Sequence, residues 1–351
     1  MKNYKSILIV INDQNFYLSH RKYIYRKFDQ YKIYCLCFKK ITKTKIGNIN
    51  FLSLETDLYS MNLISLLKVS KSILRVAKSL KIDLIHVYGI RPILFSTYLI
   101  FQNKKVLMTF TGLGLLNSSR RMIDKLIFFF IKFIIKLLNL SNNLYFNFQY
   151  TLKKFTKNIE FKSTSLEEKE FKKKTNYNQD IKNIIVISRI LKSKGLMKLL
   201  NYSYHNPKIK FTILGKFDLS HPDSLSNKQL NQLKSRKNIK YFGYKKNIKN
   251  YISNSDALLF LSNYGEGIPR ILLEAGALTI PIITEENCNF PINFKKFIFF
   301  VKEYNLSIFN NNFFNDKKNK INQFYMYIYK NFSEDNVYKF NNKIYKKLLN
   351  N

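Results

Sequence analysis

The chain has 351 residues and 46% of them are hydrophobic, which suits two average domains and excludes low-complexity disorder as a global description. Sixty Lys and Arg against 22 Asp and Glu give a formal net charge of +38, a field that favours polyanions such as nucleic acid, an anionic membrane or phosphorylated substrates. The abundance of Lys, Asn, Ile, Phe and Tyr is also what A- and T-rich codons supply, and this alternative accounts for much of the lysine but not for the scarcity of acidic residues.

The three cysteines predict neither a disulfide framework nor a zinc site. Cys35 and Cys37 alternate within an apolar stretch and therefore share one face of a predicted strand, and Cys288 stands far from both. No second cysteine pair and no histidine cluster has the spacing of metal ligands. We expect reduced core cysteines in a cytoplasmic protein.

No membrane-spanning segment is expected. The apolar run within Met1–Ile11 is too short for a signal peptide and predicts a first buried strand. The longest apolar stretch, Leu126–Leu140, is interrupted by Lys132 and Lys136 and is shorter than the roughly 20 residues of a spanning helix.

The first part of the chain alternates short apolar runs with amphipathic stretches of helical length. Strands are predicted at Ser6–Ile11, Lys32–Phe38, Asn50–Leu54, Leu84–Tyr88, Lys105–Phe110 and Leu144–Phe148. Helices are predicted at Arg21–Phe28, Asn62–Leu80, Pro92–Phe101 and Arg121–Leu138. Continuous apolar strands that alternate with helices indicate a parallel sheet covered on both faces.

A polar, highly charged run at 166–180 interrupts this rhythm and predicts a linker between a first domain at 1–165 and a second at 181–300. In the second domain, strands are predicted at Asn183–Ser188, Lys210–Leu214, Ile239–Gly243, Ala257–Leu261 and Ile280–Thr284. Helices are predicted from Gly195 and at Asn227–Ser235, Ile248–Ser253 and Pro269–Leu278. Residues 301–351 are expected to form a partly helical tail with a terminal helix such as Asp335–Leu349.

The most informative segment is SNYGEGIPRILLE, from Ser262 to Glu274. It follows a predicted strand, turns through Gly265 and Gly267, and enters a helix with Pro269 in its first turn. The start of a helix leaves N–H groups free and carries a positive partial charge, so a diphosphate is stabilised there.

A second strand end, SRILKSKG from Ser188 to Gly195, supplies cations. Arg189 offers a planar guanidinium and Lys194 a compact ammonium, and both suit phosphate oxygens. The carboxylates of Glu266 and Glu274 would repel a diphosphate. With the cations holding the phosphates, the carboxylates are free to accept hydrogen bonds from sugar hydroxyls.

These two segments resemble the retaining glycosyltransferases of family 4, which have the GT-B fold of two Rossmann-like α/β domains facing each other across a cleft. Further stretches resemble the bacterial surface-polysaccharide branch of that family: FYLSHR (16–21), DLIHVYGIRP (83–92) and FTGLG (110–114). The resemblance covers about residues 6 to 285.

The resemblance implies a role for each matching residue. Arg189 and Lys194 would bind the donor diphosphate and stabilise the leaving nucleotide, and Glu266 would contact the transferred sugar. Glu274 would contact the ribose hydroxyls, and Gly267 and Ile268 complete the implied nucleotide-sugar site. Family members act without a bound metal, and the chain has no Asp-x-Asp pair, so neither cofactor nor metal is expected.

The acceptor side is less defined. His20, His86 and Gly112 are its candidates, but His86 equally suits a buried histidine, Gly112 a simple chain turn, and Ser19 before His20 a helix N-cap. The chain departs from the family pattern at Asn12–Gln14, where many members have a Gly-Gly loop, and after Phe290, where the family pattern fades.

The predicted function is transfer of a hexose or N-acetylhexosamine, from a UDP-sugar in preference to a GDP-sugar, to a lipid-linked glycan in surface-polysaccharide synthesis. The predicted helix within 126–138 is either core packing with a basic edge or a contact with the inner face of the plasma membrane. The alternatives are a degenerate GT-B protein that binds without turnover and a basic nucleic-acid-binding protein, for which the sequence shows no motif.

Overall fold

The computed structural model describes residues 4–56, 63–96, 98–99, 104–114, 122, 128–129, 133, 144–148, 159–173, 181–309 and 311–350. The chain divides into two compact units, one formed by Met1–Glu167 with Phe332–Asn351 and the other by Glu168–Asn331. The division at Glu167 falls at the start of the expected linker, and the expected tail contributes residues to both units.

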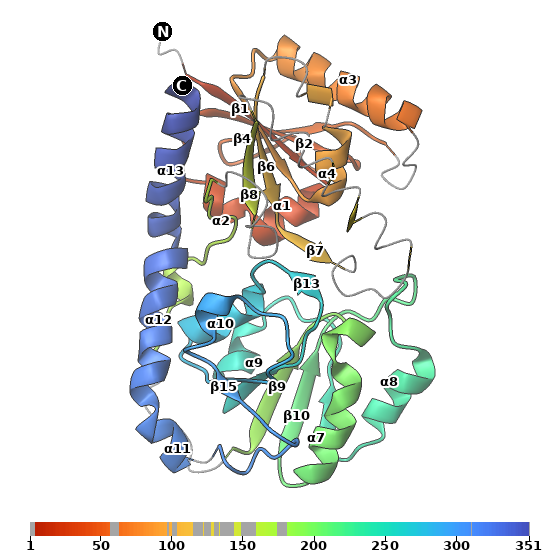
Figure 1. Ribbon diagram of the computed structural model, residues 1–351, viewed down its shortest axis with the longest axis vertical. Coiled ribbons are helices and arrows are strands. Elements are labelled where there is room, and N and C mark those ends of the chain that lie inside the picture. Colours follow the sequence, from red (N-terminus) through yellow and green to blue (C-terminus); the bar gives the residue numbers. More distant parts are fainter. Residues whose placement is uncertain are drawn as a thin grey trace. The chain divides into compact units, whose positions relative to one another are not determined.

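The first unit contains a sheet with the strand order β3-β4-β2-β1-β5-β6-β8 in its described part (Figure 1). Its strands are β1 (Ser6–Ile11), β2 (Lys32–Cys37), β3 (Lys45–Ile46), β4 (Ile49–Ser53), β5 (Leu84–Tyr88), β6 (Lys105–Phe110) and β8 (Leu144–Phe148). All neighbours are parallel except β3 and β4. In the central register, Ile7 lies opposite Ile33 on one side and Leu84 on the other.

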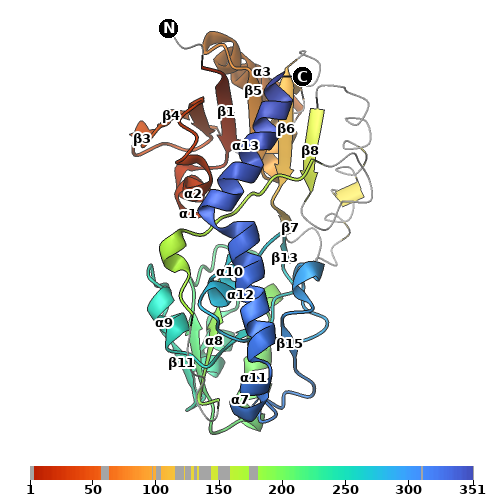
Figure 2. The ribbon, with the colours of Figure 1, turned by 90° about the vertical axis from the view of Figure 1, so that its left-hand side faces the viewer.

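Helices cover both faces of this sheet. The helices in its described part are α1 (Gln14–His20), α2 (Lys22–Tyr25), α3 (Leu63–Ser79), α4 (Ile90–Phe95) and α13 (Glu334–Asn350). Because side chains alternate along a strand, Leu8 and Val10 pack with α3 and α4 while Ile7 and Ile9 pack with α1, α2 and α13. Figure 2 shows α13, the last helix of the chain, lying along this second face.

Most strand predictions in this unit are confirmed. The strands at Ser6–Ile11, Leu84–Tyr88, Lys105–Phe110 and Leu144–Phe148 have the expected bounds. Cys35 and Cys37 are buried in one apolar cluster with β1, as the shared strand face predicts.

The helix predicted at Arg21–Phe28 is confirmed in part, because α2 occupies Lys22–Tyr25 within it, whereas α1 at Gln14–His20 was not predicted. Asp13 is the N-cap, with its carboxylate accepting the Phe16 N–H at 2.8 Å, so Ser19 is not a cap and His20 ends a helix. The helix predicted at Arg121–Leu138 lies outside the described residues apart from Met122, Phe128, Phe129 and Phe133.

The second unit contains a parallel sheet with the order β11-β10-β9-β12-β14-β15 in its described part. Its strands are β9 (Asn183–Ile187), β10 (Lys210–Leu214), β11 (Ile239–Tyr241), β12 (Ala257–Phe260), β14 (Ile282–Thr284) and β15 (Phe299–Phe300). The chain starts at the centre, runs to one edge and returns to fill the other, so the order reverses between β9 and β12. This is the Rossmann arrangement, which binds ligands at the carboxyl ends of the two strands at the reversal.

Helices flank this sheet too. They are α7 (Leu199–His205), α8 (Asn227–Lys234), α9 (Lys249–Ser253), α10 (Arg270–Ala277), α11 (Asn311–Asp316) and α12 (Lys318–Phe332). Figure 1 shows α7 and α8 on one side of the sheet and α10 on the other. A Cβ on Gly276 of α10 would lie 2.2 Å from Cδ1 of Ile328, so the glycine lets α10 and α12 pack closely.

The segment after residue 300 is more regular than expected. Three helices, α11, α12 and α13, fill most of its described part, and each buries apolar side chains such as Phe314, Ile328 and Tyr345. Among the described residues, no helix is both long and apolar enough to cross a membrane.

A buried polar cluster joins α13 to the sheet of the first unit. The ring of His86, which is fully buried at the middle of β5, has Nδ1 2.7 Å from the Tyr345 hydroxyl and Nε2 2.7 Å from the Thr109 hydroxyl. The Tyr25 hydroxyl lies 2.9 Å from that of Tyr345. Burial, helped by the Arg21 guanidinium, holds the pKa of His86 well below its ordinary value of 6.5.

The neutral His86 ring makes stability depend on pH. Its contribution is fully present above about pH 6.5 and falls below that pH, because the unfolded chain then takes up a proton that the folded ring does not. We expect His86→Gln to reduce the slope of the unfolding free energy between pH 6.5 and 5.0 by up to about 1.4 kcal/mol per pH unit, measured by urea denaturation followed by circular dichroism. His221→Gln, at a half-buried histidine of the second unit, should have a smaller effect. Equal slopes in wild type and His86→Gln would contradict this assignment.

Candidate functional site

The predicted donor residues lie at the reversal of strand order in the second unit. The segment Ser188–Gly195 follows β9, and the segment Leu261–Pro269 follows β12, which is the neighbouring strand. The carboxyl ends of both strands therefore bring the two motifs to the same edge of the sheet.

The loop after β9 forms two short 3-10 turns, Lys192–Lys194 and Leu196–Lys198, before α7 begins at Leu199. The helix predicted from Gly195 therefore begins four residues later. Asp223 fixes the first turn, because its carbonyl accepts the Lys192 N–H at 2.8 Å and its carboxylate accepts the Ser193 N–H at 3.1 Å.

Lys194 points into the protein, and its side chain is only 5% exposed. Its ammonium donates to the carboxylate of Glu266, which is 32% exposed, and lies 4.8 Å from the centre of the Tyr264 ring. Burial lowers the pKa of Lys194, and the Glu266 carboxylate opposes that shift. Arg189 is exposed, with its guanidinium carbon 5.2 Å from the centre of the same ring.

The loop after β12 is tied to its neighbours through the backbone. The Asn263 N–H donates to the Ser193 carbonyl at 2.8 Å, which joins the two motif loops directly. From the loop after β14, the Asn289 N–H donates to the Ser262 carbonyl at 2.8 Å and its side-chain amide donates to the Tyr264 carbonyl at 3.2 Å.

Gly267 is buried and Ile268 half-buried just before α10. Pro269 is the N-cap of α10 with φ −63°, one residue before the first turn in which it was expected. No side-chain hydrogen bond caps α10 in the described structure, so its first-turn N–H groups are suited to an anion.

Glu274 has a partner that the motif did not predict. Its carboxylate accepts a hydrogen bond from Arg270 Nε at 2.7 Å, and Arg270 Nη2 lies 3.3 Å from the carboxylate of Glu170. Burial raises the pKa of Glu274, and the Arg270 guanidinium opposes this rise. The i,i+4 spacing of Arg270 and Glu274 was the signal in the sequence.

The candidate acceptor residues belong to the first unit and lie in different environments. His20 is exposed at the end of α1, where its ring lies 5.2 Å from that of Phe16. Gly112 is half-buried in the short strand β7 (Gly112–Gly114). His86 is inside the core rather than at the end of a strand, so the structure gives it a packing role and no surface for an acceptor.

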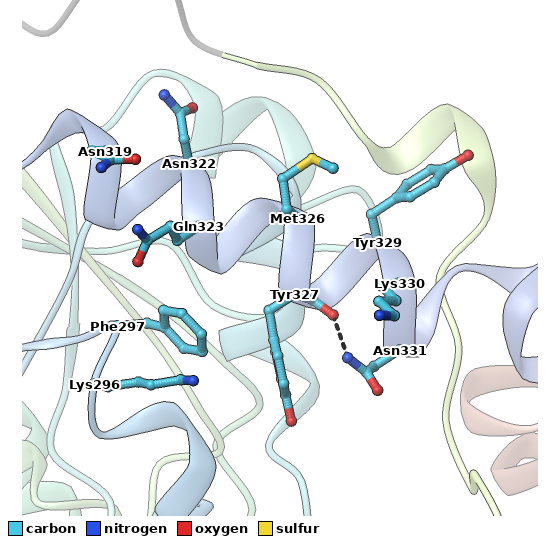
Figure 3. Close-up of a pocket in the computed structure, with 10 residues that line it drawn as sticks. All are labelled: Lys296, Phe297, Asn319, Asn322, Gln323, Met326, Tyr327, Tyr329, Lys330 and Asn331. Atoms are coloured by element: carbon cyan, nitrogen blue, oxygen red, sulfur yellow. Dashed lines mark hydrogen bonds between the residues drawn. The ribbon is translucent and has the colours of Figure 1, made fainter.

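A separate groove of about 500 Å³ lies beside α12 and contains none of these residues (Figure 3). It is lined by Lys296, Phe297, Asn319, Asn322, Gln323, Met326, Tyr327, Tyr329, Lys330 and Asn331. In the described part of the chain, no three His, Cys, Asp or Glu side chains gather closely enough to hold a metal ion, and independence from metal remains a prediction.

Two Rossmann units of this kind define the GT-B fold. Solved structures share it over nearly the whole chain: a glycosyltransferase from Rickettsia africae matches with a TM-score of 0.73 at 18% identity, covering 99% of this chain and 100% of that one. Sucrose-phosphate synthase from Thermosynechococcus elongatus matches with a TM-score of 0.75 at 13% identity, covering 99% of each chain. HepE from Anabaena, in complex with UDP and glucose, matches with a TM-score of 0.70 at 12% identity, covering 99% of this chain and 100% of that one.

Residues 167–311 match the family described as Glycosyl transferases group 1. This segment contains both motif loops and the strand reversal between them. No curated protein sequence matches the chain. The family match and the GT-B fold together support a GT-B glycosyltransferase.

The close approach of the two motif loops depends on Gly195. Its φ is +71°, and a Cβ there would lie 2.3 Å from the Leu261 carbonyl oxygen. Gly243 is a matched control, because its φ is also +71° but no atom lies within 4 Å of a Cβ. We expect Gly195→Ala to lower the free energy of unfolding by about 1–3 kcal/mol more than Gly243→Ala, measured by urea denaturation. If both variants lose the same free energy of unfolding, the contact between residue 195 and Leu261 does not contribute to stability.

Proposed function

We propose that the chain is a retaining, metal-independent glycosyltransferase of family 4. It moves a hexose or N-acetylhexosamine from a nucleotide-diphosphate sugar to a lipid-linked glycan of a surface polysaccharide. The observation that carries the proposal is the cluster of Arg189, Lys194 and Glu266 at the strand reversal of a Rossmann unit. We favour UDP over GDP as the nucleotide, which agrees with the UDP bound in the HepE structure.

The cluster suits a diphosphate leaving group. As the bond between the anomeric carbon and the phosphate oxygen breaks, negative charge grows on the diphosphate, and fixed cations stabilise that charge without reorganisation. Lys194 has three N–H donors, so its ammonium can keep Glu266 as a partner and still donate to a phosphate oxygen. Arg189 is exposed and offers a planar group to a second oxygen.

The two glutamates suit the sugar and the nucleoside. Glu266 is partly exposed beside the ammonium, where its free oxygen is placed to accept from a sugar hydroxyl. Glu274, which lies within α10 and is held by Arg270, suits the two ribose hydroxyls. In the retaining step, the acceptor hydroxyl attacks from the side of the leaving group, and its proton passes to a diphosphate oxygen, so the new glycosidic bond replaces the broken one.

A donor screen tests this function. UDP- and GDP-sugars are offered with EDTA present, and release of free nucleotide is followed for wild type, Glu274→Ala and Lys194→Gln. We expect metal-free turnover or slow hydrolysis of one donor, with kcat/KM lowered about 100- to 1,000-fold in Lys194→Gln because it removes charge opposite the leaving group. Lys208→Gln removes the same charge at an exposed position before the amino end of β10 and should stay within about twofold of wild type.

If no donor releases free nucleotide and neither UDP nor GDP raises the melting temperature, the proposal is overturned. A degenerate binding protein would instead show the thermal shift without turnover. Both outcomes are read from the same samples.

We further propose that the enzyme acts at an anionic membrane surface, where a lipid-linked acceptor is held. The exposed side of α3 combines Ile64, 66% exposed, and Leu67, 41% exposed, with basic residues, and α3 contains no acidic residue. The basic residues are Lys68, Lys71, Arg75 and Lys78, all exposed. Phe129 and Phe133, within the stretch that first suggested this contact, are 70% and 51% exposed. Such a face binds anionic lipid through both charge and apolar area.

Flotation with phosphatidylglycerol vesicles tests the membrane contact. Replacing Lys68, Lys71, Arg75 and Lys78 by Gln should weaken binding by up to about a thousandfold, because each basic residue near the surface contributes roughly 1 kcal/mol. A control in which Lys228, Lys234, Lys237 and Lys240 become Gln loses the same charge from exposed sites of the second unit and should bind as wild type does. Equal losses in both variants would mean that net charge alone, not α3, drives binding.

A further inference from the structure

Tyr264 belongs to the motif loop after β12, and its ring lies close to both predicted phosphate-binding cations. The centre of the ring lies 4.8 Å from Lys194 Nζ and 5.2 Å from the guanidinium carbon of Arg189. Both distances are within the range of roughly 6 Å in which the face of an aromatic ring attracts a cation.

The backbone of Tyr264 is fixed from several directions. Its carbonyl accepts the Glu266 N–H at 2.7 Å and the Asn289 side-chain amide at 3.2 Å. Its own N–H donates to the Ser262 hydroxyl at 3.2 Å. A ring anchored in this way restricts the positions that the two cations can take.

The cations need such a restraint because they repel each other. Burial is the main cause that lowers the pKa of Lys194, and the positive charge of Arg189 nearby lowers it further. Glu266 neutralises Lys194 and, in the described structure, forms no ion pair with Arg189. The ring offers its negative face to both side chains without adding a carboxylate that would repel phosphate.

We propose that Tyr264 is a positioning residue that holds Arg189 and Lys194 together for the diphosphate of the donor. The inference rests on the proposed donor function of this site. It assigns the effect to the aromatic ring and not to the phenolic hydroxyl, and it confines the effect to the phosphate part of the ligand.

The test compares binding of UDP and of uridine to wild type, Tyr264→Phe and Tyr264→Leu by isothermal titration calorimetry. Tyr264→Phe keeps the ring and should bind UDP within about twofold of wild type. Tyr264→Leu should weaken UDP binding about five- to thirtyfold, the loss expected when two cations each lose a contact with an aromatic face. Uridine, which has no phosphate, should bind all three proteins within about twofold of one another. Tyr264→Met repeats the test with a more flexible apolar side chain if Tyr264→Leu has a lower melting temperature.

Each outcome separates the two claims. UDP binding that survives Tyr264→Leu and Tyr264→Met overturns the positioning role and leaves the donor function standing. Loss of UDP binding in Tyr264→Phe equal to that in Tyr264→Leu assigns the effect to the hydroxyl and also overturns the inference. A wild type that does not bind UDP by calorimetry and shows no thermal shift with GDP overturns the donor function itself.

Discussion

An ammonium group inside a protein must be paired, and the edge of the second unit that carries the two motif loops is organised around one. Moving a charged amine out of water costs several kcal/mol even after the protein relaxes. Lys194 is 5% exposed, and its charge is met by the Glu266 carboxylate and the face of the Tyr264 ring, which both come from the loop after the neighbouring strand. The pair therefore links the two loops that carry the predicted chemistry.

Two glycines let the loops at this edge approach each other. A Cβ on Gly215, directly after β10, would lie 1.7 Å from the Ser188 carbonyl oxygen, and one on Gly195 would lie 2.3 Å from that of Leu261. The loops after β9, β10 and β12 thus touch through backbone. A side chain on either glycine would push the loops apart and separate Lys194 from Glu266. The ion pair therefore depends on the close approach of the backbone.

Much of this architecture could be predicted from the sequence because parallel strands that are buried on both faces have continuous apolar sequences. β1, β5, β6 and β10 have the predicted bounds for that reason. Helix α1 was not predicted because its N-cap is Asp13, whereas Ser19 was interpreted as the cap of a later helix. The terminal helix predicted at Asp335–Leu349 agrees with α13, whereas α11 and α12 were not predicted. Their Lys-, Asn- and Tyr-rich sequence does not show which apolar side chains are buried, and only the packed structure does.

The candidate site shows the same limit. The positions of Arg189, Lys194, Glu266 and Glu274 at strand and helix ends followed from the two motifs, whereas their partners did not. Lys194 and Glu266 are 72 residues apart in the chain. The hydrophobic periodicity of the sequence predicts helices and strands but not a contact over such a separation. Tyr264 contacts the cations through the face of its ring, and the side-chain amide of Asn289 donates to the Tyr264 carbonyl. Neither contact involves an acidic residue, so no charge pattern in the sequence predicts it.

The two units also show why similar strand orders do not give similar sites. Each contains an arginine close to a tyrosine ring, since Arg21 lies 4.7 Å from the centre of Tyr88 and Arg189 lies 5.2 Å from that of Tyr264. Arg21 is 4% exposed, and its guanidinium donates to the carbonyls of His20 and Ser163, so its charge is used within the core. Arg189 is exposed and keeps its donors available to a ligand. Of these two arginines, Arg189 combines exposure with a neighbouring buried ammonium at the strand reversal, and this combination suits it to a charged ligand.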